Sequence, residues 1–305
     1  MKVLIVGQGA IGLLWFAKLY GKVDLRLQQS KRSQNKGNFS FTDFRNSSFE
    51  IPINNFNNKE DWQPDLIFVC VKSYQLSAAL SEIQTFIPNN CPIIITHNGM
   101  GCINSKQITS MAGSAIMTLL TTHGCMKRTK SHIIHTGKGN SELGLSYGHI
   151  TTNVAKEIST MLDSALPNVK WTDSILHSQW VKLLVNCSIN PLTAIDNVKN
   201  GALSQPKYQK IIKNVIKEVI EVAYAADDII LDYDEMLSKV AAVIQFTAQN
   251  SSSMRQDILL QRPSENEFIC GFVVRQARQQ KVEVPATLAL YKEVKKISVT
   301  CADKL

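Results

Sequence analysis

The first half of the chain carries short, uninterrupted apolar runs that are typical of strands buried on both faces. These runs are residues 2–6 (KVLIV), 23–28, 64–72 and 91–97. Helical periodicity follows the first of them, at residues 13–20, and the third, at residues 73–87. Residues 38–44 and 47–53 predict a hairpin, and the strand-like runs from 112 to 145 are expected to complete the sheet and to add antiparallel strands. Alternating strands and helices of this kind predict an α/β fold with a parallel sheet.

The pattern changes after Asp173. Residues 174–195, 208–228, 233–249, 266–280 and 285–299 all show helical periodicity, and no strand signal of comparable strength lies among them. Pro191 predicts that the first of these helices ends or bends there. The chain is therefore expected to consist of a Rossmann-type dinucleotide-binding domain over residues 1–172 and an all-helical C-terminal domain over 173–305, with the substrate and catalytic groups in the second.

A glycine motif directly follows the first predicted strand. GQGAIG places Gly7, Gly9 and Gly12 between that strand and a helix, which is the context that the Gly-x-Gly-x-x-Gly dinucleotide motif requires. Gly7 permits the tight turn, Gly9 lets the backbone approach a pyrophosphate, and Gly12 lets the helix pack on the strand. The amides at the start of the helix would then face the phosphates. The cofactor-binding residues predicted from this motif are Gly7, Gln8, Gly9, Ala10, Ile11 and Gly12.

The residues after the second strand bear on the choice of cofactor. An NAD site usually has an acid here to bind the ribose 2′-hydroxyl, whereas this chain has Gln28-Gln29-Ser30-Lys31-Arg32. Lys31 and Arg32 are expected to contact a 2′-phosphate, with Ser30 as a further candidate, so the cofactor is expected to be NADP(H). The other interpretation is a solvated basic loop.

Five further polar residues stand out against apolar surroundings. Lys72 and Asn98 follow two predicted strands, at the edge of the sheet where open α/β folds bind ligands. In KLLVNCSIN, Lys182, Asn186 and Asn190 recur every four residues, so a helix would align them on one face. Burying such groups without partners costs about 1–3 kcal/mol each, so either the fold or a polar ligand must supply partners.

Composition narrows the range of functions. The chain has 305 residues and is 44% hydrophobic and 19% charged, which is typical of a globular protein. No stretch is long and apolar enough to cross a bilayer, and glycines and Gln8 interrupt the apolar N-terminus, so neither membrane insertion nor a signal peptide is expected. The formal charge of +8 is dispersed, which disfavours nucleic acid as a partner and fits small anionic ligands. Seven scattered cysteines indicate free thiols in the cytoplasm, and no metal-binding spacing is found.

Taken together, these motifs resemble the ketopantoate reductase (2-dehydropantoate 2-reductase) family. GQGAIG, Val71-Lys72, HNGMG (97–101), WVKLLVNCSINPLTAI (180–195) and SSMRQDILLQRPSE (252–265) carry the resemblance, which covers both halves. The last two segments are specific to the family. The resemblance implies reduction of the ketone of ketopantoate by NADPH to give pantoate, on the route to pantothenate.

The resemblance also implies roles for individual residues. Lys182 falls on the family's catalytic lysine, which would protonate or polarise the developing alkoxide. Glu265 would hold Lys182 or the substrate by a hydrogen bond, and together with Asn98 and Lys72 it would also lie at the cofactor. The residues implied to bind the substrate are Asn98, Asn186, Asn190, Asn200 and Ser253. The polar row at 182–190 would then form one wall of a cleft between the halves, with a 2-keto acid as its partner.

Several alternatives stay open on the sequence alone. A related NADP-dependent reductase could use the same chemistry on another 2-keto acid. A non-catalytic NADPH-binding regulator would have lost the proton donor, yet Lys182 and Glu265 are both present. The loop from Asn54 to Asp61 departs from the family by its many asparagines. The oligomeric state, monomer or homodimer, is not indicated.

Overall fold

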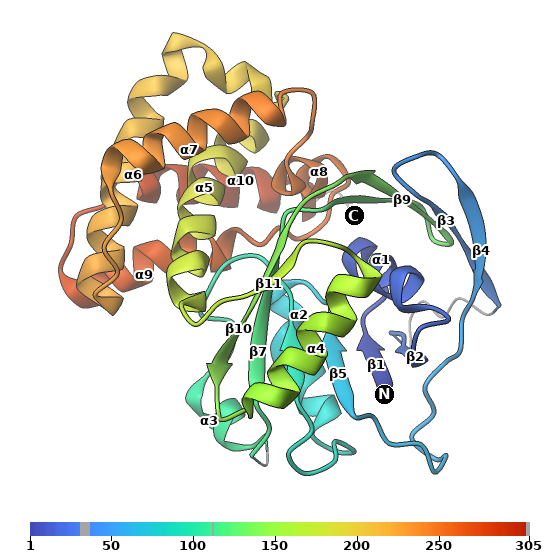
Figure 1. Cartoon of the computed structure of the whole chain (residues 1–305). Coiled ribbons are helices and arrows are strands. Elements are labelled where there is room, and N and C mark those ends of the chain that lie inside the picture. The colour runs from blue at the N-terminus through green and yellow to red at the C-terminus, as the bar shows by residue number, and fades with distance from the viewer. Residues whose placement is uncertain (31–36, 112, 303–305) are drawn as a thin grey trace. The chain divides into compact units, whose positions relative to one another are not determined.

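The computed structural model describes residues 1–30, 37–111 and 113–302, and it divides into two compact units (Figure 1). The first unit comprises Met1–His97 and Ile103–Leu176. The second comprises the short segment Asn98–Cys102 and the described chain from His177 onward. The predicted α/β fold class, with a Rossmann-type N-terminal part and a helical C-terminal part, is confirmed.

A seven-stranded sheet forms the centre of the first unit, in the order β11-β10-β7-β6-β5-β1-β2. Strands β1 (Lys2–Val6), β2 (Asp24–Gln28), β5 (Leu66–Val69), β6 (Ile93–Ile95) and β7 (Ile116–Thr121) run parallel. β10 (Ser141–Tyr147) pairs antiparallel with β7, and β11 (Val169–Trp171) extends the sheet. The chain goes from β1 to β2 on one side and returns to β5 on the other. Ligands of open α/β sheets bind at such a reversal, outside the carboxyl ends of the strands.

The helices of this unit are α1 (Ala10–Leu19), α2 (Ser73–Ile83), α3 (Ser105–Thr109) and α4 (Thr152–Ala165). Leu13, Leu14, Trp15 and Phe16 on α1 are all buried, and α1 contacts α4. The helix is apolar around most of its circumference because a second layer of strands covers the side that faces away from the main sheet.

That second layer is a four-stranded sheet in the order β4-β3-β9-β8. The predicted hairpin is present as β3 (Asn38–Thr42) and β4 (Ser48–Pro52). Of the strand-like runs between 112 and 145, β7 and β10 belong to the main sheet, whereas β8 (Gly124–Thr129) and β9 (His132–Gly137) form an antiparallel pair in this second layer. β9 pairs in parallel with β3, a partner about 90 residues away in the sequence, so local patterning could not reveal it.

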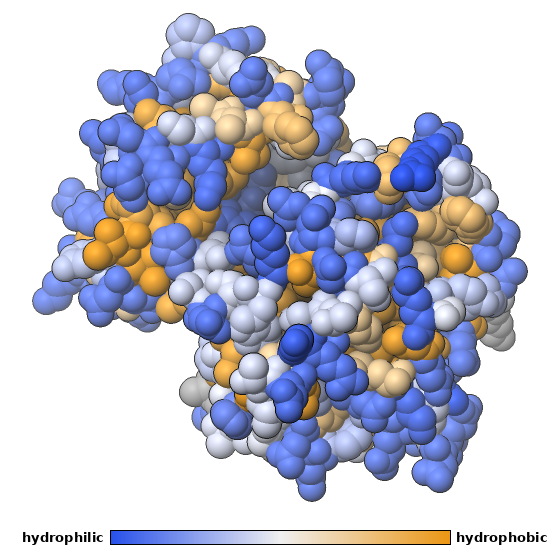
Figure 2. Space-filling view, viewed as in Figure 1, coloured by the Kyte–Doolittle hydropathy of each residue, from blue (hydrophilic) through white to orange (hydrophobic). Residues whose placement is uncertain are grey.

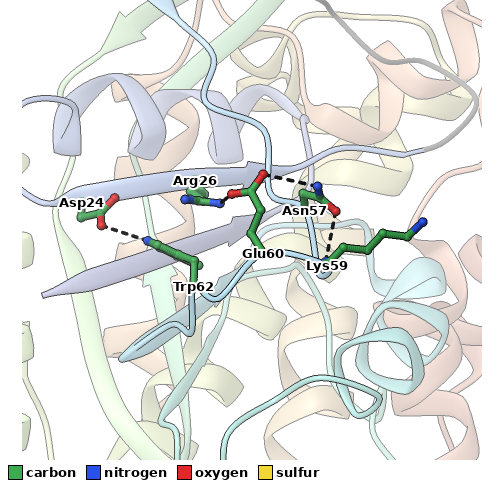
Figure 3. Close-up of polar contacts among 6 residues, drawn as sticks. All are labelled: Asp24, Arg26, Asn57, Lys59, Glu60 and Trp62. Carbon is green, nitrogen blue, oxygen red and sulfur yellow. Dashed lines mark hydrogen bonds and ion pairs between the residues drawn. The ribbon is translucent and has the colours of Figure 1, made fainter.

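The asparagine-rich loop before β5 is tied to the edge strand β2 (Figure 3). The indole of Trp62 donates to Asp24 Oδ2 over 2.9 Å, and the guanidinium of Arg26 lies over the Trp62 ring at 4.7 Å. Arg26 also forms an ion pair with Glu60, to which the Asn57 amide donates at 3.3 Å. These contacts fix the loop to β2.

The regular elements described in the second unit are all helices. It contains α5 (Ile175–Ile195), α6 (Pro206–Asp227), α7 (Tyr233–Phe246), α8 (Ser253–Leu259), α9 (Cys270–Gln280), α10 (Pro285–Ala302) and the short 3₁₀ turns η1 (Asn200–Ser204) and η2 (Asn266–Phe268). The first residues of α5 belong to the first unit. Trp180 is completely buried, and its indole donates to Asp227 Oδ2 at 2.7 Å. The buried Glu218 carboxylate accepts from the amides of Ala286 and Thr287, which caps α10 and joins it to α6.

The sequence predicted that helix α5 ends or bends at Pro191. The helix does not end there but continues to Ile195. Proline removes one backbone donor and crowds the preceding turn. The Thr193 hydroxyl oxygen lies 3.1 Å from the carbonyl oxygen of Ile189 and 2.9 Å from that of Asn190, next to the proline. Leu192 and Ala194, beyond the proline, are buried in the helical core, and this burial favours continuation of the helix.

Polar and charged side chains cover most of the face drawn in Figure 2, with apolar patches between them. None of the helices described here is long and apolar enough to cross a membrane.

Candidate active site

The glycine-rich turn lies between β1 and α1, at the carboxyl end of β1, which pairs with β2 and β5. Gly7 has φ +108°, and a Cβ there would stand 2.4 Å from the carbonyl oxygen of Cys70. A Cβ on Gly12 would stand 2.2 Å from the carbonyl oxygen of Gly7. Both positions therefore require glycine for the folding of the turn itself, as the sequence predicted.

Gly9 differs from these two positions. Its backbone is extended, with φ −70° and ψ 176°, and the nearest atom to a built Cβ is 3.8 Å away. The protein itself thus leaves room for a side chain at residue 9, so the fold gives no reason for glycine there. A ligand phosphate close to the backbone does give one, and Gly9 is the N-cap residue of α1, whose first amides favour an anion. The turn, which includes Gln8, Ala10 and Ile11, fits the pyrophosphate of a dinucleotide.

The carboxyl end of β2 has no acid. Gln28 is half-buried, and its side-chain carbonyl oxygen is buried without a hydrogen-bond partner. The amide of the next residue, Gln29, donates to Asn55 Oδ1 at 2.6 Å, which adds to the attachment of the asparagine-rich loop. Lys31 and Arg32, predicted to contact the 2′-phosphate, lie outside the described residues.

Lys72 is the N-cap residue of α2, three positions after the end of β5. Its backbone amide donates to the Gln75 side chain at 3.2 Å, which fixes the start of the helix. Lys72 thus lies at the carboxyl side of the parallel strands, on the same side of the sheet as the glycine-rich turn.

In the second unit, Asn98 and Glu265 meet directly. The Asn98 side-chain amide donates to Glu265 Oε2 at 2.9 Å, and the Asn98 backbone amide lies 3.3 Å from Oε1. Glu265 is 4% exposed. Both carboxylate oxygens are therefore oriented by one residue, which lies 167 positions away in the sequence.

The backbone around Gly99 explains how Asn98 is held. Gly99 has φ +83°, and a Cβ there would lie 2.1 Å from the carbonyl oxygen of Phe268. The next amide, of Met100, donates to the same carbonyl at 2.8 Å. HNGMG therefore docks on the turn η2, immediately after Glu265, and this close approach is possible only with glycine.

Lys182 lies on α5, within electrostatic reach of Glu265. Burial lowers the pKa of Lys182 to about 8, while the Glu265 carboxylate acts in the opposite direction and raises it. An amine with a pKa near neutrality is suited to deliver a proton, since proton transfer is most efficient when the pKa of the donor lies near the working pH.

Asn186 and Asn190 follow Lys182 at intervals of four residues on α5, as the sequence predicted. The side-chain nitrogen of Asn186 is buried and makes no hydrogen bond within the protein. Asn190 is 7% exposed. A buried amide donor without a partner is costly, so the unpartnered Asn186 nitrogen suits an acceptor on a ligand.

Asn200 and Ser253 have different surroundings. Asn200 begins η1, and its side-chain nitrogen donates to Thr247 Oγ1 at 2.9 Å, whereas its side-chain oxygen is buried without a partner. Ser253 is exposed at the first position of α8. Its neighbour Ser252 is the buried cap, which accepts from the Arg255 amide and from the Thr193 hydroxyl.

Two contacts at the glycine-rich turn were not anticipated from the sequence. Lys127 Nζ donates to the carbonyl oxygen of Gln8 at 2.9 Å, and the Cys125 thiol lies 3.3 Å from the carbonyl oxygen of Ala10. Both residues are on β8. The residue pattern of this strand does not reveal which element the strand contacts. No cluster of potential metal ligands occurs among the described side chains.

Comparison with known proteins decides the family. The model of the ketopantoate reductase PanE/ApbA family matches residues 3–147, and that of its C-terminal domain matches residues 174–298. The 2-dehydropantoate 2-reductase of Vibrio cholerae serotype O1 is 33% identical over 300 residues, which cover 97% of each chain. The chain belongs to the ketopantoate reductase family.

Solved structures agree with this family at the level of fold. A PanE/ApbA family ketopantoate reductase from Ralstonia eutropha superposes with a TM-score of 0.87 at 21% identity, covering 99% of this ketopantoate reductase family member and 100% of that chain. The ternary structure of D-mandelate dehydrogenase with NADH and anilino(oxo)acetate has a TM-score of 0.90 at 23% identity, covering 99% of both chains. The same fold therefore also occurs in a dehydrogenase that was solved with NADH.

Proposed function

We propose that this protein reduces ketopantoate to pantoate with NADPH, using Lys182 as the general acid. The observation that carries the proposal is the group Lys182, Glu265 and Asn98: an ammonium whose pKa is lowered to about 8, beside a buried carboxylate that is oriented by two amide donors. Membership of the ketopantoate reductase family supplies the substrate.

The nicotinamide ring, when bound, supplies the hydride to the ketone carbon. Lys182 then stabilises the negative charge that develops on the ketone oxygen and donates its proton to it, which gives the alcohol. Glu265 keeps Lys182 protonated despite its burial, and Asn98 holds Glu265 in position. Groups that the fold itself holds in position need little reorganisation during the reaction.

The carboxylate and hydroxyl groups of ketopantoate need hydrogen-bond partners in the site. Asn186, Asn190, Asn200 and Ser253 are proposed to supply them. The unpartnered nitrogen of Asn186 is an observation in favour of this role, since an acceptor on the substrate would satisfy it.

The glycine-rich turn is proposed to hold the pyrophosphate, with Lys72 near the cofactor. Lys31 and Arg32 are proposed to bind the 2′-phosphate, because no acid follows β2 to favour NAD. We place the enzyme in the cytoplasm, where free thiols are the rule.

A steady-state assay tests the proposal. Oxidation of NADPH is followed with ketopantoate, 2-oxoisovalerate and benzoylformate as competing substrates, and kcat/KM should be highest for ketopantoate. A higher value for benzoylformate would instead favour the second candidate, a reductase of another 2-keto acid, to which the D-mandelate dehydrogenase fold draws attention.

The cofactor choice has its own test. The value of kcat/KM should be higher with NADPH than with NADH. Replacing both Lys31 and Arg32 with alanine should weaken the binding of NADPH and leave that of NADH unchanged. Equal values for the two cofactors in the wild-type protein would contradict the proposed 2′-phosphate site.

A further inference from the structure

Strand β8 contacts the glycine-rich turn through two neighbouring side chains of one face. Lys127 Nζ donates to the carbonyl oxygen of Gln8 at 2.9 Å, and the thiol of Cys125 lies 3.3 Å from the carbonyl oxygen of Ala10. Residues two apart in a strand point to the same face. Cys125 and Lys127 are half-buried, whereas Met126 and Arg128 between and after them are exposed, so this face of β8 is directed at the turn.

The Gln8 carbonyl has no place in the hydrogen-bond ladder of α1. The first backbone bond of that helix runs from the Leu13 amide to the carbonyl oxygen of Gly9, at 3.0 Å. The carbonyl of Gln8, one residue earlier, therefore depends on a partner from elsewhere. An ammonium donor makes a stronger hydrogen bond than a neutral one, so this contact fixes the peptide well.

Peptide geometry transmits the effect of Lys127 to the side of the turn where the phosphate binds. In a trans peptide the carbonyl of one residue and the amide of the next lie in one plane and point in opposite directions. With the Gln8 carbonyl turned toward Lys127, the amide of Gly9 points away from β8. The positive charge of the Lys127 ammonium next to that carbonyl also polarises the peptide, which makes the Gly9 amide a better hydrogen-bond donor to an anion.

We propose that Lys127 is a positioning residue for the cofactor: it orients and polarises the Gln8–Gly9 peptide so that the Gly9 amide binds the pyrophosphate. The proposal rests on the proposed use of NADPH. The four-stranded sheet, to which β8 belongs, would thereby have a role in cofactor binding. Lys127 would act through the backbone of the turn and would not itself contact the cofactor.

Direct binding measurements test this role without turnover. Dissociation constants of NADPH and of adenosine 2′-monophosphate, which lacks the pyrophosphate, are measured by calorimetry for the wild-type protein and for Lys127→Met. We expect roughly tenfold weaker NADPH binding in the variant, as for the loss of one hydrogen bond to a charged group. The affinity for adenosine 2′-monophosphate should stay within about twofold.

Arg128→Met is the matched control, because it removes the same charge from the next residue of the same strand, on the exposed face. It should leave NADPH affinity unchanged, and Lys127→Arg should restore most of the loss. Wild-type NADPH affinity in Lys127→Met would overturn the proposal. So would an equal loss in Arg128→Met, or equal losses for NADPH and adenosine 2′-monophosphate.

If Lys127→Met does not fold, the same measurements are made on Lys127→Gln, because the glutamine amide retains a hydrogen-bond donor but not the charge. NADPH affinity equal to that of the wild type in Lys127→Gln would then overturn the proposal. A wild-type protein that binds no NADPH would contradict the proposed function instead, so the two failures are distinguishable.

Discussion

At the scale of single residues, the proposed chemistry depends on opposite influences on one amine. Burial lowers the pKa of Lys182 and the Glu265 carboxylate raises it, with a result of about 8. The family motifs in the sequence indicated both residues. They did not indicate that Asn98 holds Glu265, because a hydrogen bond between residues 167 positions apart leaves no local pattern. The unpartnered nitrogen of Asn186 was equally invisible, since burial is a property of the folded chain.

Removing the proton donor should slow the chemical step. Lys182→Ala should lower kcat by roughly two to four orders of magnitude, with NADPH binding almost unchanged. Lys182→Arg should also be slow, because a guanidinium keeps the charge but does not release its proton at these pH values. Single-turnover reduction of ketopantoate measures the step. More than about a tenth of the wild-type rate in Lys182→Ala would contradict the assignment.

The pH dependence of the reduction should reveal the influence of Glu265. The acid must be protonated, so kcat/KM should fall as the pH rises through about 8, the pKa of Lys182. Glu265→Gln removes the charge that raises this pKa, so the alkaline limb should move to lower pH. Glu267→Gln, at an exposed carboxylate two residues along that pairs with Arg275, is the control and should leave the limb in place. An unchanged limb in Glu265→Gln would argue that the two groups are not coupled.

At the scale of elements, the sequence predicted the positions of most strands and helices but not which elements pair with one another. β1, β3, β4 and α2 lie where the pattern of apolar residues predicted them. The allocation of β8 and β9 to a separate sheet depends on pairing with β3, and the continuation of α5 past Pro191 depends on burial of Leu192 and Ala194. Both outcomes are decided by long-range contacts that outweigh the local signal.

Gly99 is a position at which an added side chain would disturb the contact between two segments of the helical unit. Gly99→Ala should destabilise the helical unit by at least about 2 kcal/mol, since it combines a positive φ with a close approach to the Phe268 carbonyl. Gly21→Ala is the control, because Gly21 has φ +76° but no atom within 4 Å of a built Cβ. The free energy of unfolding in urea is measured for both variants. Its difference between them separates the steric clash with the Phe268 carbonyl from the cost of a positive φ at alanine. Equal losses in the two would show that the contact with Phe268 contributes little.

At the scale of the whole molecule, a buried histidine pair makes the first unit sensitive to acid. His123 Nδ1 accepts from the Gly139 amide at 3.1 Å and lies 3.2 Å from His135 Nε2. Burial, together with the neighbouring His135, lowers the pKa of His123 to about 4, and burial with nearby Lys18 lowers the pKa of His135. The unfolded chain therefore binds more protons than the folded one below about pH 6.5.

The stability of this unit should accordingly be complete above about pH 6.5 and decline as the pH falls from there toward 4. Hydrogen-exchange protection factors of β8 and β9 measure the decline. In His135→Gln the dependence on pH should be weaker, whereas substitution of the exposed His149 by glutamine should not alter it. A wild-type protein equally protected at pH 7.5 and pH 5 would contradict the expectation.

The membership of Asn98–Cys102 in the helical unit has a consequence for biosynthesis. The chain passes between the units three times, at 97/98, 102/103 and 176/177. Asn98 leaves the ribosome long before Glu265 is made, and the Phe268 carbonyl that Met100 binds is made later still. The carboxylate proposed to support the proton donor is thus oriented only after residue 265 has been synthesised. A nascent chain that stalls or is cleaved before Glu265 has no counterpart for Asn98. Such a product would hold the nucleotide turn without the carboxylate that is proposed to support the proton donor.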